Sequence, residues 1–332
     1  MSIPLVQSAL EGFSLEEAFQ VVERARQAEN LDDEPPLRSA EYQRLTTAPL
    51  EIPGTLVREK VEFAAFQIPN ERARLPRGVH RLVIVPELRE VRVQVSFSRF
   101  DSLSANLQGE YDFGKYSVSP AALTLPTGNE KWLPAAEVRG EGVFFELEAG
   151  AVAAWEERPA VMERAEMLLR AYEADGRGEE FPGARFYLLH TLSHPLITAI
   201  SLECGYAASA IRERIYCAPK TSEDEGMAGV LLTTGTTGSE GTLGGLVEEG
   251  RRLTHHLQEA WDLGRLCSND PVCASHDPSG VASDRRLEGA ACHGCLYIAE
   301  CSCERFNRYL DRALLVPTIG NAPELAFFGV RP

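Results

Sequence analysis

Cysteines are concentrated in the last third of this chain, and their spacing constrains the fold more than any other feature. The 332-residue sequence contains eight cysteines. Six of them lie close together, namely Cys267, Cys273, Cys292, Cys295, Cys301 and Cys303. The knuckle Cys292-His-Gly-Cys295 can present two thiolates to one tetrahedral metal ion. Because clustered cysteines in a reducing compartment are more often metal ligands than disulfides, the spacing predicts a Zn²⁺ site formed by four cysteines.

The spacing leaves the ligand set open, because five cysteines compete for four places. The candidates are Cys267, Cys273, Cys292, Cys295 and Cys303, with either Cys267 or Cys273 spare. We favour Cys303 over Cys301 because a helix is predicted to begin near it, and a helix N-terminus stabilises a thiolate. His276 and His293 are less favoured candidates for metal ligands. The two remaining cysteines, Cys204 and Cys217, are expected in the hydrophobic core. Four sulfur ligands leave no position for water, which indicates a structural site; the alternative is that the cysteines pack as small reduced side chains.

The remaining pattern predicts a mixed α/β protein in three parts. Residues 1–50 are expected to form a helical N-terminal segment, with a capping box at Ser14–Glu17. Residues 51–150 form a β-rich region, in which valines at 91, 93 and 95 alternate with polar residues as in a half-buried strand. Residues 151–332 are expected to form a mixed α/β domain that carries the zinc site. Within it, two packed helices are predicted between Phe186 and Cys217.

Two weaker motifs support an alternative interpretation. The segment His190-Thr-Leu-Ser-His194 places two imidazoles on one helix face, but Thr191 stands where a zincin would have its glutamate. The glycine-rich segment Gly235–Gly245 lies between a strand and a helix, although it matches no standard phosphate-binding motif. The favoured reading makes the histidines core or network residues and the glycines turn residues. The alternative is a metal- or histidine-dependent phosphodiesterase or hydrolase that acts on nucleic acid.

The charge of the chain restricts its partners. There are 33 Lys and Arg against 49 Asp and Glu, a net charge of −16, which argues against a protein that coats nucleic acid. One stretch differs, because it carries seven arginines against Glu87 and Glu90: Arg72, Arg74, Arg77, Arg81, Arg89, Arg92 and Arg99. This strip suits local DNA contact, or alternatively a solvated sheet face with internal ion pairs. No secretory signal or membrane span is expected, so a soluble, cytoplasmic protein is predicted.

Several of these segments together resemble one family. They are Gly241–Val247, Cys267–Cys273, Gly289–Cys295, Cys303–Asn307 and Leu310–Val316, with further likeness upstream at Leu88–Val91, Trp132–Pro134 and Arg139–Phe144. The sequence resembles the zinc-binding domain at the C-terminus of MrfA-type helicases, which is also found in the DrmB family of the DISARM anti-phage defence system. The likeness to the DrmB family is the closer one. It covers about residues 40–316 and is strongest from His190 onward.

This resemblance implies a non-catalytic, zinc-binding accessory subunit that works with a superfamily 2 helicase in antiviral defence. The family's metal-binding cysteines would correspond to Cys292, Cys295 and Cys303, with Cys267 or Cys273 completing the set. Members of the DrmB family are usually longer and carry a further cysteine-rich N-terminal half, so a split or shortened form is expected here. The sequence contains no GxxxxGK[ST] motif, and any ATPase activity is therefore expected in a partner chain.

Overall fold

The computed structural model describes residues 36–52, 61–93, 134–174, 176, 178, 181–219, 226–235, 245–278 and 287–332. Five strands are present in this part of the chain: β1 (Phe63–Gln67), β2 (Val79–Val93), β3 (Ala135–Leu147), β4 (Ile211–Ala218) and β5 (Met227–Thr234). The α-helices are α3 (Leu37–Thr46), α4 (Asn70–Ala73), α5 (Ala149–Glu156), α6 (Pro159–Ala174), α7 (Gly183–Cys204), α8 (Gly245–Gly250), α9 (Leu253–Arg265) and α10 (Arg312–Leu315). Two 3₁₀ turns, η3 (Ala208–Ala210) and η4 (Pro323–Leu325), complete the regular structure. This confirms the mixed α/β fold class.

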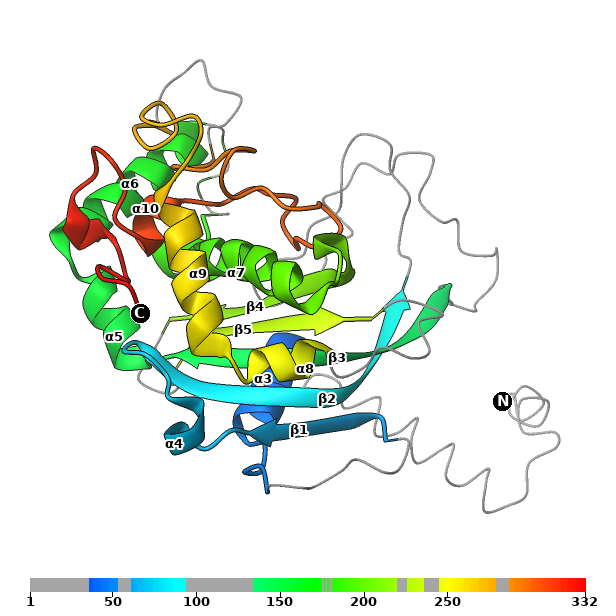
Figure 1. Cartoon of the computed structure of the whole chain (residues 1–332). Coiled ribbons are helices and arrows are strands. Elements are labelled where there is room, and N and C mark those ends of the chain that lie inside the picture. The colour runs from blue at the N-terminus through cyan, green and yellow to red at the C-terminus, as the bar shows by residue number, and fades with distance from the viewer. Residues whose placement is uncertain are drawn as a thin grey trace, which may run out of the picture.

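The strands form one antiparallel sheet with the order β1-β2-β3-β5-β4. Its two faces are both apolar, because successive side chains of a strand point to opposite sides. Phe144 and Tyr216 pack on the face covered by α3, whereas Val143 and Phe145 pack on the opposite face, against α7. Figure 1 shows this layered order, with α3 on one side of the sheet and α7, α8 and α9 on the other. The sheet combines β1, β2 and β3, which precede residue 150, with β4 and β5, which follow it. The division of the chain into three domains, with a boundary at residue 150, remains a prediction.

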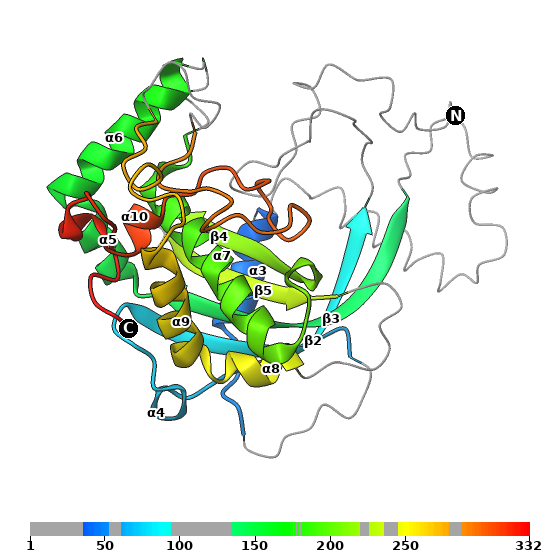
Figure 2. The ribbon, with the colours of Figure 1, turned by 45° about the horizontal axis from the view of Figure 1, so that its top comes forward.

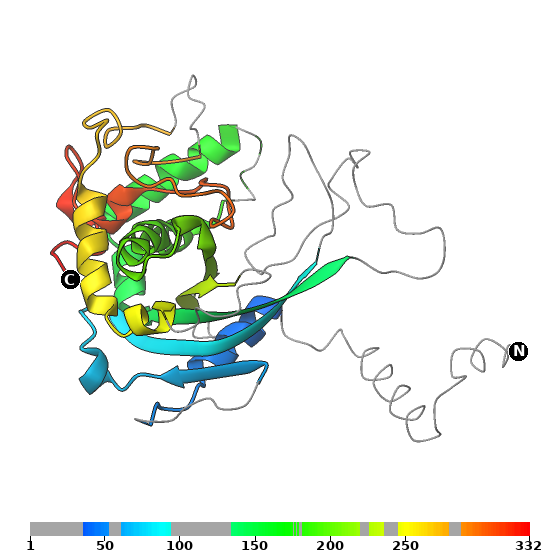
Figure 3. The same ribbon diagram turned by 45° about the vertical axis from the view of Figure 1, so that its right-hand side comes forward.

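Helix α7 lies at the centre of the molecule. Its residues from Ala184 to Ile197 are all buried, as expected for a helix that is covered on every side. The view along its axis shows the sheet on one side and irregular chain on the other (Figure 3). The irregular layer consists of residues 266–278 and 287–311, and it carries the cysteines. Helix α7 therefore lies between the sheet and most of this layer, which reaches the sheet directly where the amide of Glu213 in β4 donates to the Ser302 carbonyl at 3.0 Å.

The prediction of two packed helices between Phe186 and Cys217 was wrong in its second half. Helix α7 ends at Cys204 because Gly205 adopts a left-handed conformation with φ of 72°, which glycine tolerates without strain. The chain then forms strand β4. In β4 the side chains of Ile211, Ile215 and Cys217 face α7. The buried residues of this segment therefore follow the two-residue period of a strand and not the period of a helix.

The outer ends of β2 and β3 extend beyond the rest of the sheet as a two-stranded arm (Figure 2). Val91 and Val93 are about half exposed there, at 56% and 48%. The predicted strand is thus confirmed as far as Val93, but the expectation that its valines form the buried face is wrong, because no further layer among the described residues covers this end of the sheet. The predicted capping-box helix at Ser14–Glu17 lies outside the described residues. None of the helices in the described ranges has the length and apolar character needed to cross a bilayer.

A buried ion pair fixes the irregular layer to the helices. The carboxylate of Asp311 accepts a hydrogen bond from Arg164 Nε of α6 at 2.7 Å. It also accepts from the backbone amides of Ala290 and Ala313, each at 3.0 Å, while its own amide donates to the Thr191 hydroxyl of α7. Thr191 occupies the position of the catalytic glutamate in a zincin motif, and here its hydroxyl helps to hold Asp311 in place.

We expect Asp311→Ala to lower the free energy of unfolding by about 3–5 kcal/mol, because it leaves the buried Arg164 charge and two amides without their acceptor. Chemical denaturation of the full chain measures this. The control is Glu166→Ala, which removes the exposed Glu166–Arg170 pair and should cost about 0–1 kcal/mol. Equal losses for the two variants would contradict the role assigned to Asp311.

Candidate metal centre

Two turns of the irregular layer bring four cysteines together. Cys267 and Cys273 come from the turn after α9, and Cys292 and Cys295 come from the CxxC knuckle. The four sulfur atoms all lie within 4.8 Å of one another. The Sγ–Sγ distance is 3.3 Å between Cys267 and Cys292 and 3.8 Å between Cys292 and Cys295. These distances agree with about 3.7 Å, the edge of a tetrahedron of sulfurs around zinc.

Backbone amides point at the sulfurs, as they do around thiolates. The amide of Asn269 donates to Cys267 Sγ at 3.4 Å, and the amide of Gly294 donates to Cys292 Sγ at 3.3 Å. The approach is close at Gly294, where a Cβ would lie 2.5 Å from Ser268 Oγ. The two turns are thus packed directly against each other, and each donates an amide to a cysteine two residues earlier.

A buried arginine supplies positive charge beside the sulfurs. A hydrogen bond from Cys295, assisted by the nearby Arg312 guanidinium, lowers the pKa of Cys273 to about 5. The Arg312 side chain is fully buried and donates to the carbonyls of Gly264 and Arg265 at the end of α9, and to Asp270. It therefore anchors the first cysteine turn to α9 and partly balances the negative charge of thiolates.

The donor set fits zinc. Four thiolates at tetrahedral spacing, two of them with amide donors, could hold one Zn²⁺ with no coordination position left for water or substrate. Such a closed site fixes loops and does no catalysis. Both Cys267 and Cys273 take part in the group, so neither is spare in this geometry.

Cys303 is not in this group, although the sequence favoured it. Its sulfur lies beside His190, His194 and Glu213. The reason for choosing Cys303 was wrong, because no helix begins there: the chain turns through left-handed residues at Phe306 and Asn307, and α10 starts only at Arg312. The competitor Cys301 is exposed.

The other sequence candidates are dispersed. His276 accepts a hydrogen bond from Arg164 at its carbonyl, and the His293 ring packs against Tyr297. Cys204 and Cys217 belong to neither cysteine-containing group. The side chains of His190 and His194 are fully buried in α7.

Of the glycine-rich segment, residues 236–244 lie outside the described residues. A third set of ligand-type residues, Glu203, His255 and His256, lies near the surface, where Glu203 also pairs with Arg252.

Most of the described arginines of the basic strip form ion pairs within the chain. Arg72 pairs with Glu51, Arg81 with Glu146, and Arg92 with Glu90. Arg89 pairs with both Glu62 and Glu137. Among the described residues Arg74 and Arg77 form no ion pair, and Arg99 lies outside them. This arrangement agrees with a solvated sheet face that carries internal ion pairs.

Comparisons with known proteins agree with the cysteine site. Residues 192–296 match the family model described as MZB, the MrfA Zn-binding domain, and this range contains all four clustered cysteines. The chain therefore contains a zinc-binding domain of the MrfA type. It is also similar to the DISARM protein DrmB of Bacillus paralicheniformis, with 39% identity over 261 residues. That alignment covers 76% of this chain and 43% of the relative, so the chain spans less than half of the relative's length. Both findings confirm the resemblance seen in the sequence motifs.

We expect Cys292→Ser to lower the zinc content of the purified chain by about one ion, because it removes a sulfur that contacts two others in the group. Elemental analysis against protein concentration measures this. The matched control is Cys301→Ser, an exposed cysteine of the same loop, which should keep the wild-type content. Unchanged zinc in Cys292→Ser would rule out the four-cysteine site.

Proposed function

We propose that this chain is a non-catalytic, zinc-binding accessory subunit of a DISARM-like anti-phage defence complex, in which a superfamily 2 helicase subunit provides the motor. The observation that carries the proposal is the closed group of four cysteines within a domain of the MrfA type. We assign Cys267, Cys273, Cys292 and Cys295 as its zinc ligands. The similarity to the DISARM protein DrmB supports the choice of system, and the cytoplasm, where invading DNA is met, is its expected location.

The burial of the histidines argues against the alternative hydrolase. A hydrolytic site must admit substrate and water, yet His190 and His194 are both completely buried under the loop layer. Thr191, where a catalytic glutamate would be needed, instead accepts the amide of Asp311. Together with the absence of a GxxxxGK[ST] motif in the sequence, this supports a subunit without catalytic activity of its own.

An apolar surface beside the cysteine site suits a protein partner. An open pocket of about 410 Å³ adjoins Cys267 and Cys295 and is lined by Leu263 and Leu266. Leu266 and Val272 are each 75% exposed, so the turn that the metal would fix presents two large apolar side chains to solvent. Exposed apolar residues grouped in this way are typical of a protein interaction site.

The charges around this pocket favour a protein over DNA. Glu259 and Asp262 line it as well, and their nearest positive group is Arg331, which pairs with both. Phosphate binding needs an excess of positive charge, and this surface has none. We therefore assign the pocket lined by Leu263 and Leu266, together with the exposed Val272 of the turn that follows, to the helicase. Local DNA contact is confined in this proposal to the arginine strip, where Arg74 and Arg77 are the arginines without an ion pair among the described residues.

Coexpression tests the accessory role. The chain should co-purify with the superfamily 2 helicase of a DISARM system and should change that helicase's DNA-stimulated ATPase rate, while the chain alone hydrolyses no ATP. Light scattering on the purified mixture gives the stoichiometry. A stable complex that forms without any effect on the motor would restrict the role to assembly, and separate elution of the two chains would refute the proposal.

Substitutions in the apolar surface locate the contact. We expect the double variant Leu266→Glu and Val272→Glu to weaken helicase binding by about tenfold or more, because two buried apolar contacts would become charged. Leu202→Glu is the matched control, since Leu202 is also 75% exposed but lies at the far end of α7. Binding is measured by surface plasmon resonance. Equal affinities of the double variant and the control would exclude this surface.

A further inference from the structure

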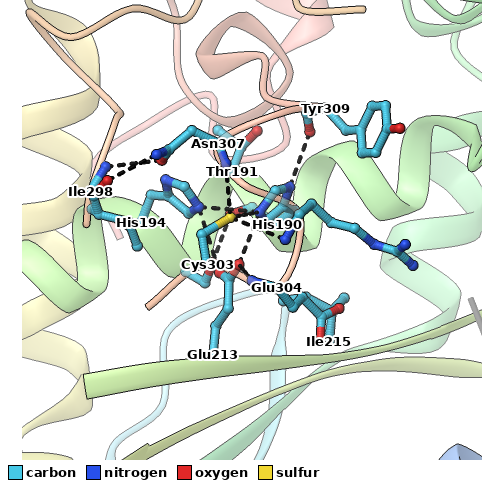
Figure 4. Close-up of polar contacts among 12 residues, drawn as sticks. His190, Thr191, His194, Glu213, Ile215, Ile298, Cys303, Glu304, Asn307 and Tyr309 are labelled. Atoms are coloured by element: carbon cyan, nitrogen blue, oxygen red, sulfur yellow. Dashed lines mark hydrogen bonds and ion pairs between the residues drawn. The ribbon is translucent and has the colours of Figure 1, made fainter. Parts of the chain in front are cut away.

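A second group of ligand-type side chains lies under the cysteine-rich loops. His190 and His194 come from α7, Glu213 from β4, and Cys303 from the irregular layer (Figure 4). All four side chains are buried, and their candidate ligand atoms lie within 4.8 Å of one another. His190 Nε2 lies 3.1 Å from Cys303 Sγ, 3.1 Å from His194 Nε2 and 2.9 Å from Glu213 Oε1.

The tautomers of the two histidines follow from their backbone partners. His194 Nδ1 lies 2.8 Å from the carbonyl oxygen of Leu296, and His190 Nδ1 lies 3.3 Å from that of Tyr309. A carbonyl oxygen can only accept, so each Nδ1 must carry the hydrogen and donate. In the neutral imidazoles both Nε2 atoms then carry a free lone pair, and these two atoms lie 3.1 Å apart. A hydrogen bond from the distal nitrogen to a carbonyl is the usual way in which a metal-binding histidine is oriented.

The sulfur of Cys303 is surrounded as the sulfurs of the four-cysteine site are. It accepts the backbone amides of Arg305 at 3.3 Å and Asn307 at 3.2 Å. The first of these repeats the contact from the residue two positions later that is seen at Cys267 and Cys292. The left-handed conformation of Phe306 and Asn307 gives the turn the shape that lets the amides converge on one sulfur. Converging backbone amides stabilise an anionic sulfur.

Glu213 occupies a position where an apolar residue would be expected. It lies between Ile211 and Ile215 on the face of β4 that packs against α7. Its carboxylate accepts the Ser193 hydroxyl and the Glu304 amide, and within the described residues its ion-pair partners are only the two histidines. A buried carboxylate beside a buried cysteine needs a compensating positive charge, and no lysine or arginine in the described chain provides one by pairing with Glu213.

We propose that His190, His194, Glu213 and Cys303 form a second, separate site for a divalent transition metal, with Zn²⁺ as the ion. Two imidazoles, one carboxylate and one thiolate are a donor set that zinc accepts in tetrahedral geometry. With Zn–N and Zn–O near 2.1 Å and Zn–S near 2.3 Å, neighbouring ligand atoms are expected about 3.3–3.6 Å apart. The observed spacings of 2.9–3.7 Å surround this range. One ion would balance the charges of the carboxylate and the thiolate.

The second site would join three layers, and the four-cysteine site reaches only one of them, the irregular loop layer. Its ligands connect the sheet through β4, the central helix α7 and the loop after the knuckle. Only His194 and Glu213 fall within residues 192–296. The site is buried and supplied with four ligands, so its role is structural, and the proposal is independent of the helicase partnership.

Metal content and cobalt spectroscopy test the proposal. We expect about two zinc ions per wild-type chain and about one in Glu213→Gln and in Cys303→Ser, which are nearly isosteric changes. Apo-protein refilled with Co²⁺ should bind about two ions in the wild type. The Glu213→Gln variant should keep the intense sulfur-to-cobalt bands of the four-cysteine site while losing the second equivalent. The matched control is Cys217→Ser, a buried cysteine on the same strand as Glu213, which should keep both ions.

X-ray absorption at the zinc edge of the wild type keeps the test decisive if a variant fails to fold. A mixed shell of sulfur and nitrogen or oxygen supports the second site, since the first alone gives an all-sulfur shell. A wild-type chain with about one zinc and an all-sulfur shell would overturn the proposal and leave a hydrogen-bonded His–Glu–Cys network. Two ions retained in both Glu213→Gln and Cys303→Ser would overturn the assignment of these ligands.

Discussion

The burial of α7 is the constraint on which the rest of the structure depends. A helix covered on all sides needs an apolar layer against each face, and the sheet provides only one of them. Helix α9 covers a further side, and an irregular stretch of chain, whose backbone groups are not satisfied by helix or strand hydrogen bonds, covers the rest. Specific polar contacts fix this layer instead: the Asp311–Arg164 pair, the Arg312 contacts to the end of α9 and the amides directed at cysteine sulfurs. The four clustered cysteines therefore lie where ordinary secondary structure is missing.

The sequence predicted the parts of this molecule in which a local pattern determines the outcome. The strand through Val91 and Val93 follows from its two-residue period, and the CxxC knuckle is recognisable from its spacing alone. The partners of the knuckle were less clear, because Cys273 and Cys303 are equivalent as residue types. Cys303 was favoured over Cys301 because a helix was expected near residue 303, and that segment instead turns through left-handed residues.

The second group was missed for a related reason. The spacing of His190 and His194 by itself favours a core network over a ligand pair. The signal that would have separated the two readings is Glu213, a carboxylate in an otherwise apolar strand row. It was hidden because the segment after Gly205 was assigned to a helix, in which residues 211, 213, 215 and 217 would not share a face. An error in secondary structure thus concealed a chemical juxtaposition that depends on β4 being a strand.

The sequence separation of the two ligand groups has a consequence for the order of assembly. Two short turns supply the cysteines at 267, 273, 292 and 295, so a local loop closure of modest entropy brings them together. The four residues at 190, 194, 213 and 303 come from a helix, a strand and a distant loop, and they meet only after α7 has docked on the sheet. A nascent chain can organise its cysteine turns around an ion early. The buried His–Glu–Cys group, by contrast, can form only when the long-range packing is complete.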